Sequence, residues 1–372
     1  MDRLELLPML RGAYMAVLGY PVIVHSAKDG RLDIPELAFS FADERQEGLN
    51  LPGRRPPMAL RVKGLGSFYV GRDWEEAEQA ARMPSGKLFA TNDARSARRG
   101  VVEGKVVLVT GGAQGFGAEI AWGLAERGAF VIIADINLEG ARKQADKLNS
   151  SGHHRAEAVE VDVSSESSVR KLAEKALLYA GGIDVLISNA GVLRAGSVLE
   201  QSSADFEFVT RINYSAFFLL VKQVASILVR QRSTNPGYSS DIIQINSKSG
   251  LVGSSKNAAY AGGKFGSIGL VQSFALELVE YGIKVNAICP GNFFDGPLWS
   301  DPDRGLFVQY LKANKVPGAR NVMDVRKFYE EKVPMRRGCE NQDVLRAILY
   351  CVEQQYETGQ AIPVTGGQVM LG

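Results

Sequence analysis

The chain has 372 residues, of which 45% are hydrophobic, and its formal net charge is +2 at neutral pH. This length suggests two domains or one enlarged α/β domain, and the apolar content suffices for a large core. The near-neutral charge argues against nucleic acid or a membrane surface as a partner. The N-terminus lacks a signal-peptide pattern and the most apolar run, from Ala129, is too short to cross a bilayer, so we expect a cytoplasmic protein.

The three cysteines, Cys289, Cys339 and Cys351, lie far apart and are odd in number. Their spacing fits neither a disulfide framework nor a zinc site. We therefore expect free, buried thiols in a reducing compartment.

The first hundred residues differ in character from the rest, because Pro, Gly and Arg are scattered through them. A strand–turn–strand is expected over 58–70 and a helix over 74–82. The polar, basic stretch 93–100 is typical of a linker. The sequence predicts a small N-terminal α+β segment, residues 1–98, followed by a larger domain, residues 99–372.

From about residue 104, short apolar runs alternate with amphipathic helical stretches such as 168–179 and 265–281. The runs read as strands are 106–109, 131–134, 185–187, 242–245 and 285–288. Strands that alternate with helices indicate βαβ units and a parallel sheet covered on both faces. The fold class expected is therefore α/β, a doubly wound Rossmann-type sheet.

A glycine-rich loop follows the first of these strands and leads into a helix. It contains Gly111, Gly115 and Gly117, with Gln114 and Phe116 between and beside them. Glycines at this point allow a tight turn and a close backbone approach to a pyrophosphate, which the helix N-terminus then stabilises. The order strand, loop, helix favours a dinucleotide site, and a glycine turn without a ligand is the alternative.

Asp135 ends the second strand, and no Arg or Lys directly follows it. A carboxylate at this position accepts hydrogen bonds from an adenosine ribose and repels a 2′-phosphate. We therefore expect NAD rather than NADP as the cofactor. The same residue could serve as an ordinary helix cap, and the two interpretations are compatible.

Two further stretches lie where the third and fourth strands should end. Asp162 and Val163 are candidates for adenine contact. Asn189, Ala190 and Gly191 form a run of small residues suited to a floor near the ribose. Taken alone, each stretch is also typical of a turn after a strand.

Several ordered motifs in residues 104–372 resemble the short-chain dehydrogenase/reductase family. They are TGGAQGFG at 110–117, SNAG at 188–191, Asn213 in RINYSAFF, Ser247 placed 13 positions before Tyr260, the YxxxK pair of Tyr260 and Lys264, and Pro290 with Gly291 in CPG. The resemblance implies an oxidoreductase whose nicotinamide cofactor contacts these loops, including Tyr260 and Lys264.

Tyr260 and Lys264 lie four positions apart, which places both side chains on one helix face. A neighbouring ammonium lowers a tyrosine pKa, so Tyr260 is the candidate acid and base. Such a pair in isolation is usually a surface pair. The resemblance implies that Lys264 also binds the nicotinamide ribose, that Ser247 holds the substrate oxygen, and that Asn213 holds a water leading to solvent.

Within the family, three segments resemble the sorbitol-6-phosphate 2-dehydrogenases: INSKSGLVGSSKN, VPMRRGCENQDV and TGQAIPVTGGQVM. This resemblance implies interconversion of D-sorbitol 6-phosphate and D-fructose 6-phosphate by hydride transfer at carbon 2, in a homotetramer. The alternatives are a dehydrogenase of an unphosphorylated polyol or other secondary alcohol, and an NAD-binding regulatory protein. The complete set of Ser247, Tyr260 and Lys264 argues against a pure binding protein.

A sugar phosphate requires a cation at some distance from the reacting carbon. Lys248 is the leading candidate because it follows Ser247, and Arg194 follows the SNAG turn. The other basic candidates are Lys256, Arg336 and Arg337. Each of these five is also compatible with a solvated surface charge.

The stretch 294–333 follows the strand predicted over 285–288. It is rich in aromatic residues, Pro and Asp and has two short helical patterns. Its place beyond the carboxyl ends of the strands suggests a lid over the substrate, with an inert excursion as the alternative. Asp295 stands where the family has a threonine that meets the nicotinamide amide, so backbone groups of 292–294 are expected to take over that contact.

The segment 57–81 resembles the closing part of a class II aldolase-like domain, which uses a histidine-bound metal. Only His25 lies in the N-terminal segment, and His153 and His154 lie on a probable loop of the other domain. No metal site is expected. We interpret the segment as a catalytically silent remnant that serves packing, oligomerisation or lid support, with small-molecule sensing as an alternative.

Overall fold

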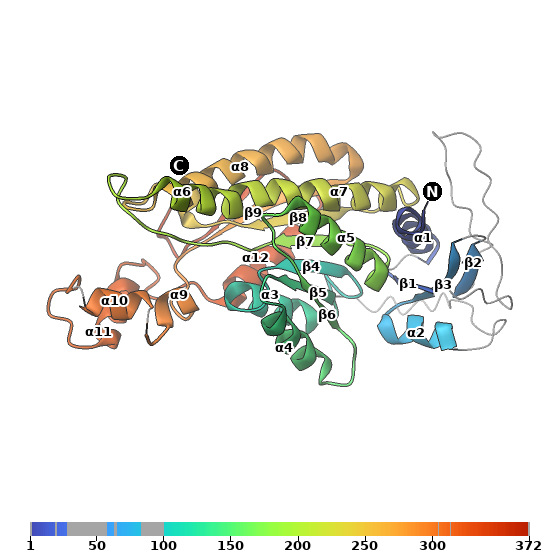
Figure 1. The fold of residues 1–372 in the computed structure, drawn as a ribbon, viewed down its shortest axis with the longest axis horizontal. Coiled ribbons are helices and arrows are strands. Elements are labelled where there is room, and N and C mark those ends of the chain that lie inside the picture. The colour runs from blue at the N-terminus through green and yellow to red at the C-terminus, as the bar shows by residue number, and fades with distance from the viewer. Residues whose placement is uncertain are drawn as a thin grey trace.

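The computed structural model describes residues 2–18, 21–27, 58–62, 65–82, 100–303, 305–312 and 314–370. Figure 1 shows an α/β body with a small sheet at one end and a helical lobe at the other. In chain order the elements are α1 Arg3–Leu18, β1 Ile23–Ala27, β2 Ala59–Val62, β3 Gly66–Gly71, α2 Trp74–Arg82, β4 Val106–Thr110, α3 Gly115–Ala125, β5 Phe130–Asp135, α4 Leu138–Asn149, β6 Ala156–Glu160, α5 Glu166–Ala180, β7 Val185–Ser188, α6 Ser203–Thr210, the π-helix η1 Arg211–Ser215, α7 Ala216–Ser233, β8 Ser240–Ile245, the 3-10 helix η2 Lys248–Gly250, α8 Ala258–Leu278, the 3-10 helix η3 Val279–Tyr281, β9 Ile283–Pro290, α9 Pro297–Ser300, α10 Leu306–Lys312, α11 Val322–Glu331, α12 Asn341–Glu353 and β10 Ala361–Val364.

The central sheet confirms the predicted Rossmann-type architecture. It has seven strands in the order β10-β9-β8-β7-β4-β5-β6, and every neighbouring pair is parallel. The five strands predicted from apolar runs correspond to β4, β5, β7, β8 and β9. β4, β7, β8 and β9 are buried along their whole length, as expected of parallel strands covered on both faces.

Two separate hydrophobic cores cover the two faces of this sheet. One core joins the sheet to α5, α7 and α8, and the other joins it to α3, α4 and α12. Figure 1 shows these two helical layers on opposite sides of the strands. The predicted helices over 168–179 and 265–281 correspond to α5 and α8, and α8 begins earlier, at Ala258.

The N-terminal segment forms a three-stranded antiparallel sheet in the order β1-β3-β2, with α1 and α2 beside it. The predicted strand–turn–strand and the helix over 74–82 are confirmed by β2, β3 and α2, whereas α1 and β1 were not predicted. Apart from Gly100, the predicted linker lies outside the described residues, so the boundary at 98/99 stays a prediction.

Helix α1 is not detached from the larger domain, because its buried leucines belong to the same core as α5 and α7. Arg11 and Asp184, which directly precedes β7, are both fully buried, and Arg11 donates two hydrogen bonds of 2.7 Å to the Asp184 carboxylate. A side chain at Gly12 would lie 2.1 Å from the Gln231 carbonyl oxygen of α7, so glycine lets the two helices cross in backbone contact. The segment therefore packs as part of the core of the larger domain.

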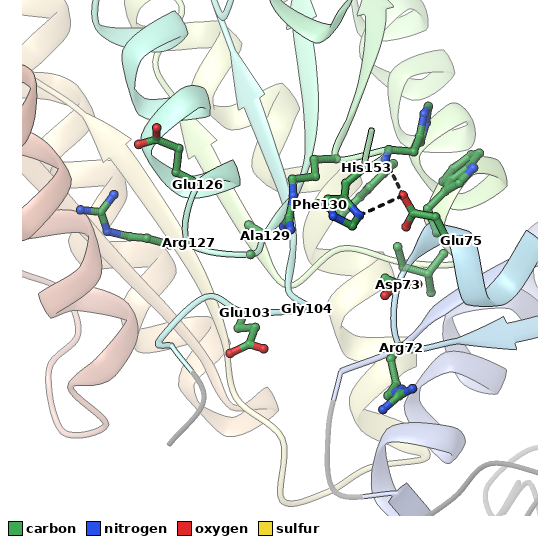
Figure 2. A pocket seen from close by; sticks show the side chains of 15 residues that line it. Arg72, Asp73, Glu75, Glu103, Gly104, Glu126, Arg127, Ala129, Phe130 and His153 are labelled. Carbon is green, nitrogen blue, oxygen red and sulfur yellow. Dashed lines mark hydrogen bonds and ion pairs between the residues drawn. The ribbon is translucent and has the colours of Figure 1, made fainter. Parts of the chain in front are cut away.

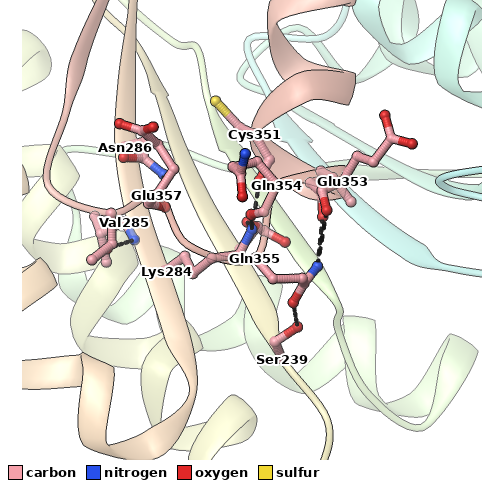
Figure 3. Close-up of polar contacts among 12 residues, drawn as sticks. Ser239, Lys284, Val285, Asn286, Cys351, Glu353, Gln354, Gln355 and Glu357 are labelled. Carbon is pink, nitrogen blue, oxygen red and sulfur yellow. Dashed lines mark hydrogen bonds and ion pairs between the residues drawn. The ribbon is translucent and has the colours of Figure 1, made fainter.

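The amino end of β9 is tied to the end of α12 by a buried lysine. The Lys284 ammonium donates to the carbonyl oxygens of Cys351 and Gln354 at 2.5 Å (Figure 3). It also pairs with Asp241 at 2.9 Å. These contacts neutralise a charge that burial would otherwise penalise. Cys289, Cys339 and Cys351 are free and buried, as predicted.

The stretch predicted as a lid folds into three short helices, α9, α10 and α11, with a core of their own. Aromatic rings dominate that core; Trp299 contacts Phe294, Phe307, Tyr310 and Tyr329. Figure 1 shows this lobe at the end of the molecule opposite the N-terminal sheet.

One helical stretch of the described chain, Ser203–Ser233, is long and apolar enough to span a membrane by length and composition alone. Half of its most apolar window is buried against the rest of the protein, which is typical of a core helix. It therefore gives weak support to a membrane span.

Candidate active site

The glycine-rich loop between β4 and α3 has the geometry of a phosphate cradle. Gly111 and Gly115 have φ values of 66° and 58°, which side chains rarely adopt. A Cβ on Gly117 would lie 2.0 Å from the Gly111 carbonyl oxygen. The loop closes this tightly only because glycine occupies these positions.

The N-terminus of α3 is left open toward this loop. Its N-cap residue, Gln114, makes no side-chain capping hydrogen bond, so side-chain capping does not occupy the first N–H groups of the helix. Such groups bind a phosphate readily. The cradle and the uncapped helix together fit the pyrophosphate of a dinucleotide.

Asp135, at the end of β5, lies against the same loop. Its carboxylate accepts hydrogen bonds of 2.9 Å from the Ala113 and Asn137 N–H groups. The negative charge is thus fixed beside the cradle and also organises the start of α4, which Asn137 caps. Asp135 is therefore not the cap of α4, because Asn137 holds that position, and it supports the helix start only through the Asn137 N–H.

The other two predicted floor segments lie where expected, after β6 and β7. Asp162 accepts hydrogen bonds from the backbone N–H and the hydroxyl of Ser164, and Val163 is buried. The Asn189 amide donates to the carbonyl oxygens of Thr110 and Gly111 at 3.0 and 3.1 Å. Asn189 therefore joins the floor directly to the glycine-rich loop.

The Thr110 hydroxyl reinforces this junction, because it accepts the N–H groups of Asn189 and Ala190 at 3.1 and 3.2 Å. A Cβ on Gly191 would lie 3.1 Å from Asn213 Oδ1 and 3.9 Å from Lys264 Nζ. Gly191 is thus the point where the cofactor floor meets the predicted catalytic residues.

Asn213 lies in the π-helix η1, a local widening of the helix that often marks a functional site. Its amide oxygen accepts the Val192 N–H at 2.9 Å, and its amide nitrogen donates to the Val192 carbonyl at 2.7 Å. This bidentate contact holds Asn213 against the loop that follows β7. Ser267 donates to the Asn213 carbonyl at 3.2 Å from α8.

Ser247, Tyr260 and Lys264 are brought together as predicted. Ser247 follows β8 and lies close enough to Tyr260 to lower the pKa of its phenol. Lys264 is buried, donates to the Ile245 carbonyl at 2.8 Å, and lies 5.7 Å from the centre of the Tyr260 ring. The four predicted catalytic residues therefore come from η1, the β8 end and α8.

The expected lowering of the tyrosine pKa by Lys264 is not what the structure shows. Burial raises the pKa of Tyr260, and its proximity to Ser247 only partly opposes this. Burial also lowers the pKa of Lys264 to about 8, which reduces the positive charge available to stabilise a phenolate. Desolvation is the largest cause for both groups, and no carboxylate contributes to either shift.

Asn246 is a positioning residue that the sequence analysis missed. Its amide oxygen accepts the Ser247 N–H at 2.8 Å, and its amide nitrogen donates to the Lys264 carbonyl at 3.0 Å. It thereby fixes the catalytic serine to the helix of the catalytic lysine. A polar residue directly after the strand was the available signal.

The five predicted phosphate anchors differ in their surroundings. Arg194 pairs with Asp205 and lies over the Phe208 ring at 4.2 Å. Arg337 donates to both carboxylate oxygens of Asp343, at 2.6 and 3.0 Å.

Arg336 donates to the Glu331 carbonyl at 2.6 Å, and Lys256 is exposed. Lys248, in η2 next to Ser247, is half-buried. Burial alone lowers its pKa, with no carboxylate contributing.

The loop after β9 connects the site to the helical lobe. Pro290 ends β9, and the Gly291 N–H donates to the Val364 carbonyl at 2.9 Å. Phe293 stacks on Phe116 of the glycine-rich loop with ring centres 4.2 Å apart. The loop that leads into the lobe is thus in direct contact with the cofactor cradle.

Asp295, which stands where the family has threonine, pairs with Arg326 of α11 at 2.7 Å. This contact ties the loop after β9 to the far helix of the lobe. The Asp295 side chain is therefore already engaged. The Asn292 N–H donates to Gln368 Oε1 at 3.3 Å and its carbonyl accepts the Cys339 N–H at 2.8 Å, so the contact of backbone groups 292–294 with the cofactor stays a prediction.

A cavity of about 730 Å³ lies at the opposite, amino-terminal edge of the sheet, between Trp74, Phe130 and His154 (Figure 2). Figure 2 shows the side chains of Glu103 and Arg127 pointing away from each other rather than toward a common point. Within the described ranges, no group of three or more His, Cys, Asp and Glu side chains could hold a metal ion. This cavity is remote from the predicted chemistry.

An open parallel sheet with a nucleotide cradle, and a serine–tyrosine–lysine set beside it, define a dehydrogenase of the Rossmann class. The profile of the short chain dehydrogenase family matches residues 105–298, and the chain belongs to that family. It is an oxidoreductase that uses a nicotinamide cofactor and acts on a CH–OH group. The family match begins after α2, so the elements from α1 to α2 lie outside it.

Among its relatives is the sorbitol-6-phosphate 2-dehydrogenase of Escherichia coli, which is 36% identical over 270 residues, covering 72% of this chain and 99% of that protein. The crystal structure of sorbitol-6-phosphate 2-dehydrogenase from Erwinia amylovora is similar with a TM-score of 0.65 and 38% identity, covering 72% of this chain and 100% of that one. A polyketide ketoreductase solved with NADPH has a TM-score of 0.62 and 27% identity, covering 71% of this chain and 97% of its own.

Proposed function

We propose that the protein is an NAD-dependent dehydrogenase that interconverts D-sorbitol 6-phosphate and D-fructose 6-phosphate at carbon 2. The observation that carries the proposal is the convergence of Ser247, Tyr260 and Lys264 beside a cradle shaped for a dinucleotide. The similarity to two sorbitol-6-phosphate 2-dehydrogenases supports the substrate. Oxidation of an unphosphorylated polyol is the second candidate, because the same catalytic residues serve any secondary alcohol.

The catalytic residues divide the proton chemistry between them. When bound, the nicotinamide cofactor accepts or supplies the hydride. Tyr260 takes the proton from the substrate hydroxyl during oxidation and returns it during reduction. Ser247, which lies next to Tyr260, orients the substrate oxygen and stabilises the charge that develops on it.

Lys264 and Asn213 support this proton transfer. The Lys264 ammonium is held in place by the Ile245 carbonyl and is positioned for the ribose hydroxyls of the cofactor. Asn213 is anchored by Val192 and is positioned to hold a water on the path from Lys264 to solvent.

Asp135 supports the choice of NAD over NADP. Its carboxylate, held beside the glycine-rich loop, would repel a 2′-phosphate and accept a hydrogen bond from a 2′-hydroxyl. We propose NAD for this chain, although a related ketoreductase was solved with NADPH. The contacts proposed for the adenine and ribose side come from Asp162, Val163 and the floor of Asn189, Ala190 and Gly191.

The test of the proposed function is Tyr260→Phe, with NAD reduction followed by absorbance and NADH binding followed by fluorescence. We expect turnover with sorbitol 6-phosphate to fall by about three orders of magnitude or more, since general acid–base catalysis contributes about 10²–10⁴-fold. Cofactor affinity should stay within a few-fold of the parent. Tyr281→Phe, at an exposed site after α8, is the matched control.

Retention of turnover in Tyr260→Phe would refute the assigned acid and base. Activity of the parent with sorbitol but not with its phosphate would favour the second candidate. We also expect a cytoplasmic homotetramer, and light scattering of the purified full chain would test the subunit count.

A further inference from the structure

Lys248 differs from the other candidate phosphate anchors in having a partly buried charge without a partner. Desolvation alone lowers its pKa, so no carboxylate of the described chain compensates its ammonium group. Buried charges in folded proteins are usually paired, because desolvation otherwise opposes the charged form. A half-buried, uncompensated cation therefore indicates that an anion supplied from outside completes the site.

Hydrogen bonds hold the backbone around Lys248 in place, so the lysine side chain starts from a fixed point. Ser247 Oγ accepts the Ser249 N–H at 3.1 Å, and the Lys248 carbonyl accepts the N–H groups of Leu251 and Val252 at 3.0 and 3.1 Å. The residue thus starts from a hydrogen-bonded turn that also holds the catalytic serine. Lys248 directly follows Ser247 in the chain, so its side chain starts one residue from the group proposed to hold the substrate oxygen.

The surroundings of the other four candidates leave them little capacity for a phosphate. Arg194 and Arg337 are already paired with carboxylates, and Arg336 donates to a backbone carbonyl. Lys256 is exposed, so water already solvates its charge. The predicted roles of Arg194 and Lys248 as substrate residues are therefore not equivalent.

We propose that Lys248 is the phosphate-recognition residue of the substrate site, and that a phosphomonoester on the carbon chain of a polyol supplies its missing counter-charge. This inference rests on the proposed dehydrogenase activity. It assigns the selection between phosphorylated and unphosphorylated polyols to one side chain, while the acid–base residues treat both alike. Arg194 then acts by closing the loop after β7 onto Asp205, without contact to the phosphate.

The experiment compares kcat/KM for sorbitol 6-phosphate and sorbitol in the parent, Lys248→Met, Lys248→Arg and Lys256→Met. Lys248→Met should lose roughly 10- to 100-fold on the phosphate ester, the range of a charge-assisted hydrogen bond, and change by less than about threefold on sorbitol. Lys248→Arg should recover most of the loss because it keeps the charge. Lys256→Met, the exposed control, should match the parent on both substrates.

A second measurement does not depend on turnover. Titration calorimetry with inorganic phosphate, in the presence of NAD, should show weaker binding to Lys248→Met than to the parent, with Lys256→Met unchanged. Equal phosphate affinity in all variants, or an equal loss of kcat/KM on both polyols, would overturn the inference. A parent enzyme that oxidises neither polyol would refute the proposed function, and the phosphate titration would still decide the role of Lys248.

Discussion

Replacement of Arg11 by methionine should destabilise the protein strongly, although Arg11 lies far in sequence from every predicted site residue. Its guanidinium donates to both carboxylate oxygens of Asp184 and, through Nε, to the Val22 carbonyl at 2.6 Å. Methionine replaces the aliphatic part of the arginine chain but not its guanidinium, so it leaves Asp184 buried without its counter-charge. Loss of one partner of a buried pair typically costs about 3–5 kcal/mol.

In a chain of 372 residues that cost corresponds to a fall in Tm of roughly 4–6 °C. Urea unfolding and thermal unfolding of the full chain, each followed by circular dichroism, would measure it. The matched control is Arg230→Met, because Arg230 links α7 to Glu5 of α1 at 3.3 Å in an exposed pair. Exposed pairs contribute about 0–1 kcal/mol, so the control should remain close to the parent.

The pH dependence of the unfolding free energy lost in Arg11→Met gives a sharper test. In the parent, Arg11 holds the pKa of Asp184 below its usual value against the opposing effect of burial. Without Arg11, burial would raise the folded-state pKa above the unfolded value, so the folded protein would bind the extra proton. Stability of the variant should then fall as pH rises through that raised pKa, and the deficit should be larger at pH 8 than at pH 5. A deficit below about 1 kcal/mol, or one equal at both pH values, would refute the reasoning.

Three further perturbations test the cofactor site. Asp135→Ala should raise kcat/KM with NADP relative to NAD by about tenfold or more, because it removes the charge that repels a 2′-phosphate; an unchanged ratio would contradict this. The raised pKa of Tyr260 leaves little phenolate at neutral pH, so log kcat/KM for oxidation should rise by about one unit per pH unit between about pH 6 and 9. The rate of reduction needs the protonated phenol and should not rise over this range. A flat oxidation profile would indicate another base. Phe293→Ala removes a ring stack on Phe116 that is worth about 0.5–1.5 kcal/mol, so NADH should dissociate roughly two- to tenfold faster in stopped-flow fluorescence; unchanged dissociation would show that the lobe does not restrain the cradle.

The parallel sheet could be predicted because its signals are local. Val- and Ile-rich runs such as Val106–Thr110 are apolar along their whole length, which is typical of strands covered on both faces. Helix α1 gave no such signal. Pro8 and Gly12 interrupt its pattern, and residues from Leu6 to Met15 are all buried, so it has no polar face to mark a helical period. Its existence depends on packing against α5 and α7, which no local pattern reports.

The candidate site also has parts that local sequence signals predict and parts that depend on tertiary packing. The glycine loop and the Tyr260–Lys264 pair are short motifs whose geometry follows from their spacing. The bond between Asn246 and the Lys264 carbonyl depends on how β8 docks on α8, so the sequence showed only a polar residue at a strand end. The pKa of Tyr260 was predicted in the wrong direction, because adjacency to a lysine is visible in a sequence and desolvation is not.

Strands β4 and β7 connect the N-terminal segment to the nucleotide site, because each of these two contacts a different end of the strand pair. At the amino end, Asp184 accepts the Val106 N–H at 2.7 Å and is neutralised by Arg11. At the carboxyl end, Asn189 donates to the Thr110 carbonyl at 3.0 Å and so forms the floor of the cradle. The register of the same strand pair is therefore fixed from both ends, once by the segment outside the family match and once by the site itself. Because NAD binds only the folded cradle, it should recover part of the Tm lost on removing Arg11, as mass action requires of a ligand that binds the native state alone.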